Sequence, residues 1–268
     1  MSLPSNDAEL FESLHQFVTT WKLLGKGFPH ADQSDRPGLA VSWPDTSFPF
    51  YNILFLNEPV SDAEVLKSKA QEASDYLQGK SHGGLFVVFH DYLSGSAKEN
   101  FTETLAEAKL VAAIPATGMA GNIFPLEAKG HPDLQFVRIE DDATIQTFAE
   151  LNCAAYNLPM ETAVSVVKDH SLWKDHAYGF LAYEGDKAVG TATAIINEGC
   201  LFLFLVATLP EAQGKGYGEA VVRYALQTAH EATGLQRTVL HATEAGYPIY
   251  ARLGYHPTTK LFLCMLQP

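Results

Sequence analysis

Hydrophobic patterning is clearest in the second half of the chain. Residues 200–207 are almost wholly apolar, as in a strand that is buried on both faces. The helix predicted over 216–233 has an apolar stripe along one side only. From residue 134 onward the predicted order is strand, helix, helix, three strands, helix, strand, helix, strand. The other strands are expected at 136–139, 178–183, 187–196, 238–242 and 255–266, and the other helices at 142–154, 160–170 and 244–253.

The first half also alternates helices and strands. Helices are predicted at 7–24, 62–77 and 101–112, and strands at 39–43, 51–56 and 84–90. Little periodicity follows, in a stretch punctuated by Gly118, Gly121, Pro125, Gly130 and Pro132. We therefore predict a boundary at about 125–133 and two domains, residues 1–128 and 129–268.

The charge of the chain limits its partners. A formal net charge of −13 argues against binding to nucleic acid, which normally needs a basic face. The charge suits an uncharged or cationic small substrate, although solubility alone explains it equally well. No apolar run approaches the ~20 residues of a membrane span. The first residues lack the basic start and apolar core of a signal peptide, so we expect a cytoplasmic protein without a membrane partner.

The cysteines predict neither disulfides nor a metal site. Cys153, Cys200 and Cys264 are odd in number and far apart, so they form no disulfide framework and no zinc motif. We expect reduced, mostly buried thiols and no metal.

The segment from Gln213 to Gly218 carries the most informative chemistry. It follows the apolar strand, contains three alternating glycines and opens the next helix. A helix N-terminus offers unpaired N–H groups to a phosphate, and glycines let a ligand approach the backbone closely. A dinucleotide fingerprint would need glycine at Glu219, and a nucleoside triphosphatase loop would need Ser or Thr at Gly216. A ligand-free turn is the remaining alternative, but glycines at this density are costly unless something requires them.

Two sequence blocks resemble the GNAT superfamily of N-acetyltransferases. Gln213-x-x-Gly216-x-Gly218 is similar to its Q/R-x-x-G-x-G/A signature, and Tyr250-x-x-x-Gly254-Tyr255 is similar to its second block. The resemblance covers about residues 134–268 and implies a GNAT fold, an α/β (α+β) arrangement with a mixed, mostly antiparallel central sheet flanked by helices. It also implies acetyl-CoA as co-substrate. By resemblance, the cofactor-binding residues would be Val206, Ala207, Gln213, Gly214, Lys215, Gly216, Tyr217 and Gly218.

The resemblance also assigns catalytic roles. Tyr250 would be the general acid that protonates the departing thiolate, because a phenol is protonated at pH 7; a packed core tyrosine is the alternative. His241 is a candidate base, although the pattern favours a structural histidine. A backbone N–H near Val206 would stabilise the oxyanion. Thr243 stands where many members carry an asparagine that contacts the cofactor. Weaker candidates are Glu198 and Glu244 as bases, a water chain in their place, and Cys200 as a nucleophile.

The first half carries neither block. Its rhythm of elements suggests a tandem protein with a degenerate, GNAT-like N-terminal domain. Its crowded aromatic residues favour a core; an acceptor pocket is the alternative. They are Trp43, Phe48, Phe50, Tyr51 and Phe55.

The predicted function is acetyl-CoA-dependent N-acetylation of a primary amine, on a small molecule or an amino group, by direct attack. The rivals are a non-catalytic acyl-CoA sensor and an enzyme that uses succinyl- or malonyl-CoA. We expect a monomer or a homodimer. Fold-level analogy does not choose among these functions.

Overall fold

The structure is a computed structural model that describes residues 7–126, 131, 133–165 and 171–267. The chain forms two compact units. The first unit comprises Met1–Met119, His241–Pro248 and His256–Pro268, and the second comprises Ala120–Leu240 and Ile249–Tyr255. Because the last strand belongs to the first unit, neither unit is one continuous stretch of the chain. The division into domains 1–128 and 129–268 stays a prediction.

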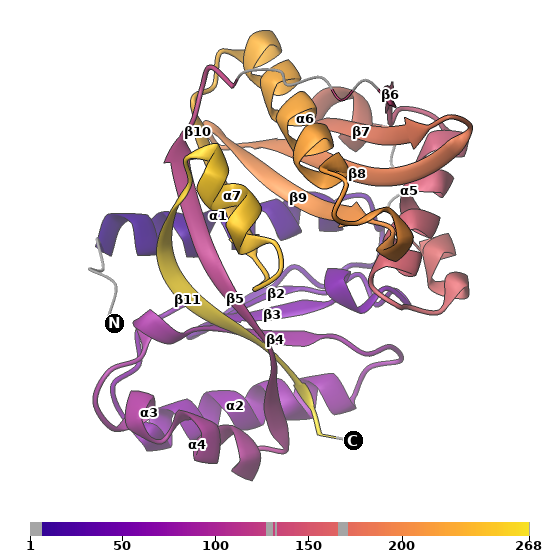
Figure 1. Ribbon diagram of the computed structural model, residues 1–268. Coiled ribbons are helices and arrows are strands. Elements are labelled where there is room, and N and C mark those ends of the chain that lie inside the picture. The colour runs from indigo at the N-terminus through magenta and orange to yellow at the C-terminus, as the bar shows by residue number, and fades with distance from the viewer. Residues whose placement is uncertain (1–6, 127–130, 132, 166–170, 268) are drawn as a thin grey trace. The chain divides into compact units, whose positions relative to one another are not determined.

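The first unit is built on strands whose neighbours run in the order β1-β2-β3-β4-β11-β5. Pairing is antiparallel from β1 to β3, parallel between β3 and β4, and antiparallel between β4 and β11. Figure 1 shows α1 on one side of β2–β4 and α2 to α4 on the other. The bounds are α1 Asp7–Gly25, β1 Asp35–Arg36, β2 Leu39–Ser42, β3 Ile53–Leu56, α2 Ala63–Gln78, β4 Leu85–Phe89, α3 Gly95–Glu99, α4 Phe101–Glu107, β5 Leu110–Asn122 and β11 His256–Leu266, with 3-10 turns at Pro49–Tyr51 and His90–Tyr92.

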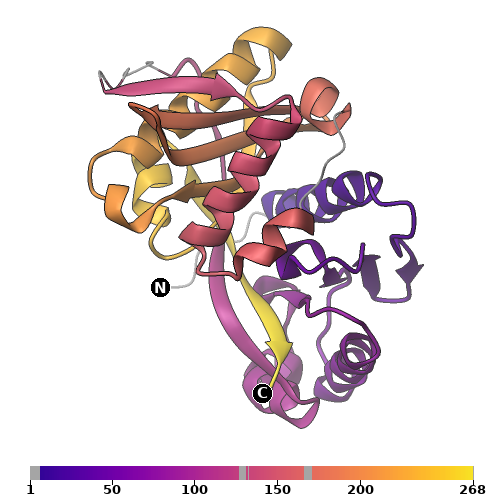
Figure 2. The ribbon, with the colours of Figure 1, turned by 90° about the vertical axis from the view of Figure 1, so that its right-hand side faces the viewer.

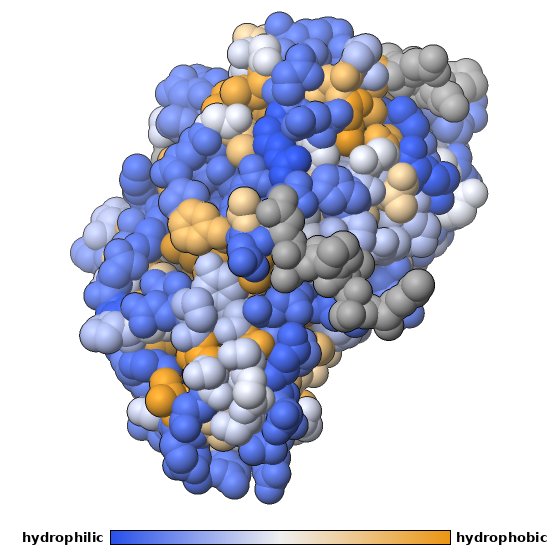
Figure 3. All heavy atoms as spheres, turned by 90° about the vertical axis from the view of Figure 1, so that its left-hand side faces the viewer, coloured by the Kyte–Doolittle hydropathy of each residue, from blue (hydrophilic) through white to orange (hydrophobic). Residues whose placement is uncertain are grey.

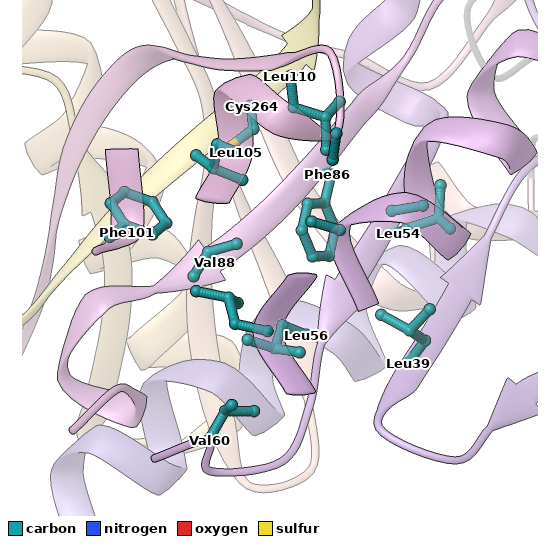
Figure 4. Packing of buried hydrophobic residues seen from close by; sticks show 14 of the residues in the cluster. Leu39, Leu54, Leu56, Val60, Phe86, Val88, Phe101, Leu105, Leu110 and Cys264 are labelled. Carbon is teal, nitrogen blue, oxygen red and sulfur yellow. The ribbon is translucent and has the colours of Figure 1, made fainter. Parts of the chain in front are cut away.

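Helix α2 shows how the sequence determines a helix start and a buried face in this unit. Asp62 caps it by accepting hydrogen bonds from the N–H groups of Glu64 and Val65. Its apolar stripe turns inward and joins a core that is almost fully buried (Figure 4). The labelled members of that core come from β2, β3, β4, α4, β5 and β11, with Val60 in the turn after β3.

One prediction in this unit is wrong. The helix predicted over 101–112 ends at Glu107, and the stretch taken as irregular contains the 13-residue strand β5. Lys109, with φ 58°, leaves the helical conformation and starts the strand. Alanines, glycines and Pro115 give β5 no apolar alternation, so its pairing beside β11 decides its conformation.

The second unit has neighbouring strands in the order β10-β9-β8-β7-β6. All pairs are antiparallel except β9 and β10, which are parallel. Figure 2 shows α5 in front of these strands, with α6 behind them. Strands β5 and β10 and helix α7 contribute residues to both units. The bounds are β6 Leu134–Arg138, α5 Asp142–Ala155, β7 Ala177–Glu184, β8 Lys187–Asn197, β9 Cys200–Thr208, α6 Tyr217–Thr233, β10 Arg237–Ala242 and α7 Tyr247–Leu253, with a 3-10 turn at Pro210–Ala212.

The predicted order of elements in the second half is confirmed except around residue 165. There the structure has a 3-10 helix at Met160–Ser165 and a π-helix at Leu172–His176 in place of one α-helix. Residues 166–170 of the predicted helix lie outside the described residues. The predicted fold class, mixed and mostly antiparallel strands flanked by helices, is confirmed.

The face in Figure 3 is mostly hydrophilic, and its apolar areas are scattered patches, which need no special explanation. Among the described residues, no helix has both the length and the apolar character that crossing a bilayer requires.

Candidate active site

The loop before α6 exposes bare backbone. Gly214 and Gly216 have φ of 77° and 85°, in the left-handed region that favours glycine. A Cβ added to Gly214 would meet nothing within 4 Å, and one on Gly216 would meet only the His131 ring, at 4.0 Å. Gly216 is the N-cap of α6 and provides no side chain to cap it. The N-terminus of α6 is therefore open to an anionic ligand.

Gly218 has a different task in the same loop. A Cβ on this residue would lie 2.9 Å from Oγ1 of Thr208, the last residue of β9. Glycine here lets α6 begin close against the end of the strand. Two of the three glycines thus shape the loop, and the third brings it next to β9.

The polar side chains of the loop already have partners. The amide of Gln213 donates to the carbonyl of Thr208 at 3.3 Å. The ammonium of Lys215 lies 3.3 Å from each carboxylate oxygen of Glu184, at the end of β7. Tyr217 is buried and donates its hydroxyl to the same carboxylate. Glu184 was not predicted, because nothing in its own turn marks it as a neighbour of the loop.

Strand β9 opens an edge beside the loop. Its described pairing with β10 is limited to Leu201 and Phe202. A bulge follows, with Leu205 at φ 41° and a shift of register against β8. Val206 and Ala207 come directly after it, on the part of β9 that has left β10. An open strand edge can bind an extended chain through its backbone.

Tyr250 lies on α7 and is 8% exposed. Burial, with the phenols of Tyr156 and Tyr255 nearby, raises its pKa well above the usual value of a phenol. The side chain is therefore protonated at neutral pH, the form in which a phenol can donate a proton. This protonation state suits the predicted acid.

Tyr156, at the end of α5, is a site residue that sequence reasoning missed. Its hydroxyl donates to the carbonyl of Val206 at 2.8 Å, so it ties α5 to the bulge of β9. The residue is 37% exposed, yet burial raises the pKa of its phenol to about 12. A tyrosine at a helix end, 50 residues before its partner, carries no local signal that would have revealed it.

His241 has the surroundings of a structural histidine. In the first unit its Nε2 lies 3.0 Å from the hydroxyl of Ser13, and its ring packs at 4.3 Å from that of Phe17. Burial lowers its pKa to about 3, so the side chain is neutral at pH 7 and only weakly basic. The role of base stays a prediction, and these contacts favour the structural alternative.

The other candidates occupy turns and caps. Thr243 accepts hydrogen bonds from the N–H groups of Gly246 and Tyr247, at the start of α7. Glu198 lies in the tight turn between β8 and β9, and Glu244 in the exposed turn before α7. Cys200 is buried at the start of β9, and all three cysteines are free thiols. Within the described residues, no group of three or more His, Cys, Asp or Glu is arranged to hold a metal ion.

Residues 145–255 match the model of the acetyltransferase (GNAT) family. The match includes the glycine loop, the opened part of β9, Tyr156 and Tyr250. The chain carries a GNAT acetyltransferase domain. The match supports an acyltransferase.

Solved structures are similar in fold to this chain over most of its length. A GCN5-related N-acetyltransferase from Kribbella flavida is 15% identical, with a TM-score of 0.70 over 99% of this chain and 97% of that one. One from Sphaerobacter thermophilus is 13% identical, with a TM-score of 0.58 over 97% and 94%. A GCN5-related N-acetyltransferase-like protein from Streptococcus suis is 14% identical, with a TM-score of 0.57 over 96% and 98%. At these identities the likeness concerns the fold. No curated protein matches the sequence.

Proposed function

We propose that the protein is an acetyl-CoA-dependent N-acetyltransferase that acetylates a primary amine of a small molecule or an amino group. The observation that supports it most is the bare N-terminus of α6 next to the opened edge of β9, within the GNAT domain. A pyrophosphate needs N–H donors and close access to the backbone, and Gly214 and Gly216 leave space for both. An extended pantetheine arm needs a strand edge with which it can pair. At Val206 and Ala207 no pairing with β10 is described, although the carbonyl of Val206 accepts the Tyr156 hydroxyl.

The thioester, once bound, supplies an electrophilic carbonyl and a thiol leaving group. The chain holds both reactants in line, so that the attack becomes effectively intramolecular. A backbone N–H near Val206 stabilises the charge that forms on the carbonyl oxygen. The nitrogen–carbon bond forms, the carbon–sulfur bond breaks, and Tyr250 donates its proton to the thiolate. The amine proton leaves to water, since the low pKa of His241 makes that ring a poor acceptor, and water returns a proton to the Tyr250 phenolate.

The acceptor in this proposal is uncharged or cationic. The net charge of −13 favours such a molecule over an anionic one. A monomer or a homodimer would suffice, since all the site residues named above come from one chain.

A panel of amines, assayed for release of free CoA thiol from acetyl-CoA, tests the function. Wild type should acetylate at least one amine, and Tyr250→Phe should lower kcat about 100-fold while leaving CoA affinity within about twofold. Tight CoA binding without transfer to any amine would favour the sensor instead. Faster turnover with succinyl- or malonyl-CoA would replace acetyl-CoA as the donor.

A further inference from the structure

The carboxylate of Glu184 contacts the loop of residues 213–218. Glu184 ends β7 and belongs to the second unit, as the loop does. Each of its carboxylate oxygens lies 3.3 Å from the ammonium of Lys215, and the same carboxylate accepts the hydroxyl of Tyr217. Lys215 also lies 5.3 Å from the centre of the Tyr217 ring, on which a cation is favourably placed. One acidic side chain thus holds both neighbours of Gly216.

The arrangement opposes the ligand that the loop is built to bind. The hydrogen bonds from Tyr217 and Lys215 lower the pKa of Glu184, so its carboxylate is charged at neutral pH. The ammonium of Lys215, the only cationic side chain between Gln213 and Gly218, is paired with the Glu184 carboxylate in this contact. A ligand phosphate at the start of α6 would meet the repulsion of Glu184 and would have to compete for Lys215.

We propose that Glu184 competes with the CoA pyrophosphate for Lys215 and thereby weakens binding of the donor. This inference rests on the proposed function. When the donor binds, the ammonium of Lys215 must leave the Glu184 carboxylate and pair with the pyrophosphate. Because the side chains of Lys215 and Glu184 are 47% and 40% exposed, the exchange needs only rotamer changes at the surface. Glu184 therefore sets donor affinity without contacting the reacting atoms.

The alternative is that Glu184 only anchors the buried ring of Tyr217. In that case a neutral hydrogen-bonding residue would leave CoA affinity unchanged or would lower it by loosening the loop. Competition predicts the opposite sign. Glu184→Gln keeps an acceptor for the Tyr217 hydroxyl, removes the charge and releases Lys215. The direction of the change in affinity therefore separates the two explanations.

The experiment measures the CoA dissociation constant by calorimetry in the full chain, at 50 and 500 mM salt. Glu184→Gln should bind CoA about three- to tenfold more tightly than wild type at low salt, and high salt should reduce the gain to less than about twofold. Glu231→Gln is the matched control. It makes the same charge change on an exposed residue near the other end of α6, about 20 Å from the loop, so its effect should be small.

A double-mutant cycle tests the withheld lysine directly. Lys215→Gln should weaken CoA binding by less than about twofold in wild type, where Glu184 holds the lysine, and by about fivefold in the Glu184→Gln background. Equal effects in both backgrounds would overturn the proposal. Repeating the cycle with 3′-dephospho-CoA should preserve the gain, because the pyrophosphate is still present. Loss of the gain would overturn the assignment to the pyrophosphate.

The outcomes separate this inference from the proposed function. A wild-type protein that fails to bind CoA would defeat the proposed function. If the wild type binds CoA and the folded Glu184→Gln variant binds it equally well or more weakly, only the proposed competition by Glu184 would be overturned. If Glu184→Gln does not fold, Lys215→Gln alone decides. A loss of about tenfold in that variant would show that the lysine already serves the ligand, and would overturn the proposal.

Discussion

Two segments of the molecule share one topology and differ at the helix start. In the first unit, β3 leads through α2 to the parallel strand β4; in the second, β9 leads through α6 to the parallel strand β10. Three of the four residues of β3 pair with β4. In β9 only Leu201 and Phe202 of nine residues pair with β10, because the strand then bulges away.

The helix starts show why only one segment offers an anion site. Asp62 fills the N-terminus of α2 with its own carboxylate, and the hydroxyl of Ser96 accepts from the N–H of Ala63. The N-terminus of α6 has only Gly216 at the corresponding place. The shared topology therefore does not create the site; a helix start without a capping side chain and an opened strand do. That the N-terminal region is a degenerate GNAT-like domain stays a prediction.

The largest effect is expected when the N-cap of α6 is given a carboxylate like that of α2. Gly216→Asp should lower CoA affinity about 100-fold, because it adds strain at φ 85° and a negative charge where the pyrophosphate would lie. Gly216→Asn is the control, since it brings similar strain without the charge and should cost only about tenfold. Calorimetric titration with CoA measures both variants. Equal losses would mean that the charge is irrelevant, and that the contrast rests on backbone shape.

The bulge of β9 provides the next test. Leu205 at φ 41° is strained, and such a conformation persists only when neighbours hold it, as the hydroxyl of Tyr156 does through Val206. Tyr156→Phe should lower kcat about 10- to 30-fold and change KM for acetyl-CoA less. Hydrogen exchange at the amides of Val206 and Ala207 should become faster as well. Tyr224→Phe is the control, because Tyr224 is equally exposed at 37% and lies on α6. Unchanged exchange in Tyr156→Phe would remove this tyrosine from the positioning of the strand.

The cap of α2 should matter for stability alone. Asp62→Ala removes the acceptor of two N–H groups and should lower the free energy of unfolding by about 1.5 kcal/mol. Denaturant unfolding measures this loss, and CoA affinity should stay unchanged. A gain of a second CoA site in this variant would show that α2 retains a latent donor site, contrary to the comparison.

Local features of the sequence predicted the centre of the candidate site. The anion-binding loop and the Tyr250 block could be predicted because each is defined by a few neighbouring residues. Glu184 and Tyr156 were not readable, because β7 and α5 bring them to the loop and to β9 from distant positions. Strand β5 was missed for a related reason. Its small residues have no periodicity, and only pairing with a distant strand makes them extended.

The smallest expected effect concerns His241, whose setting in the first unit is packed, unlike the opened β9. Its pKa falls from 6.5 to about 3 on folding, so below pH 6.5 the unfolded chain binds a proton that the folded protein excludes. The stability that neutral His241 contributes is therefore complete above pH 6.5 and is lost as the pH falls toward 3. Between pH 7 and about 5.7 we expect a loss of about 1 kcal/mol, which denaturant unfolding at each pH measures and which His241→Asn should abolish.

The same variant tests the candidate base. If His241 is structural, its replacement by asparagine should leave the pH profile of kcat between pH 6 and 8 unchanged once the variant is folded. A profile that loses its acidic limb in His241→Asn would instead restore the histidine as the base. The first unit would then contribute directly to the chemistry, and the comparison between a packed unit and a reactive one would no longer hold.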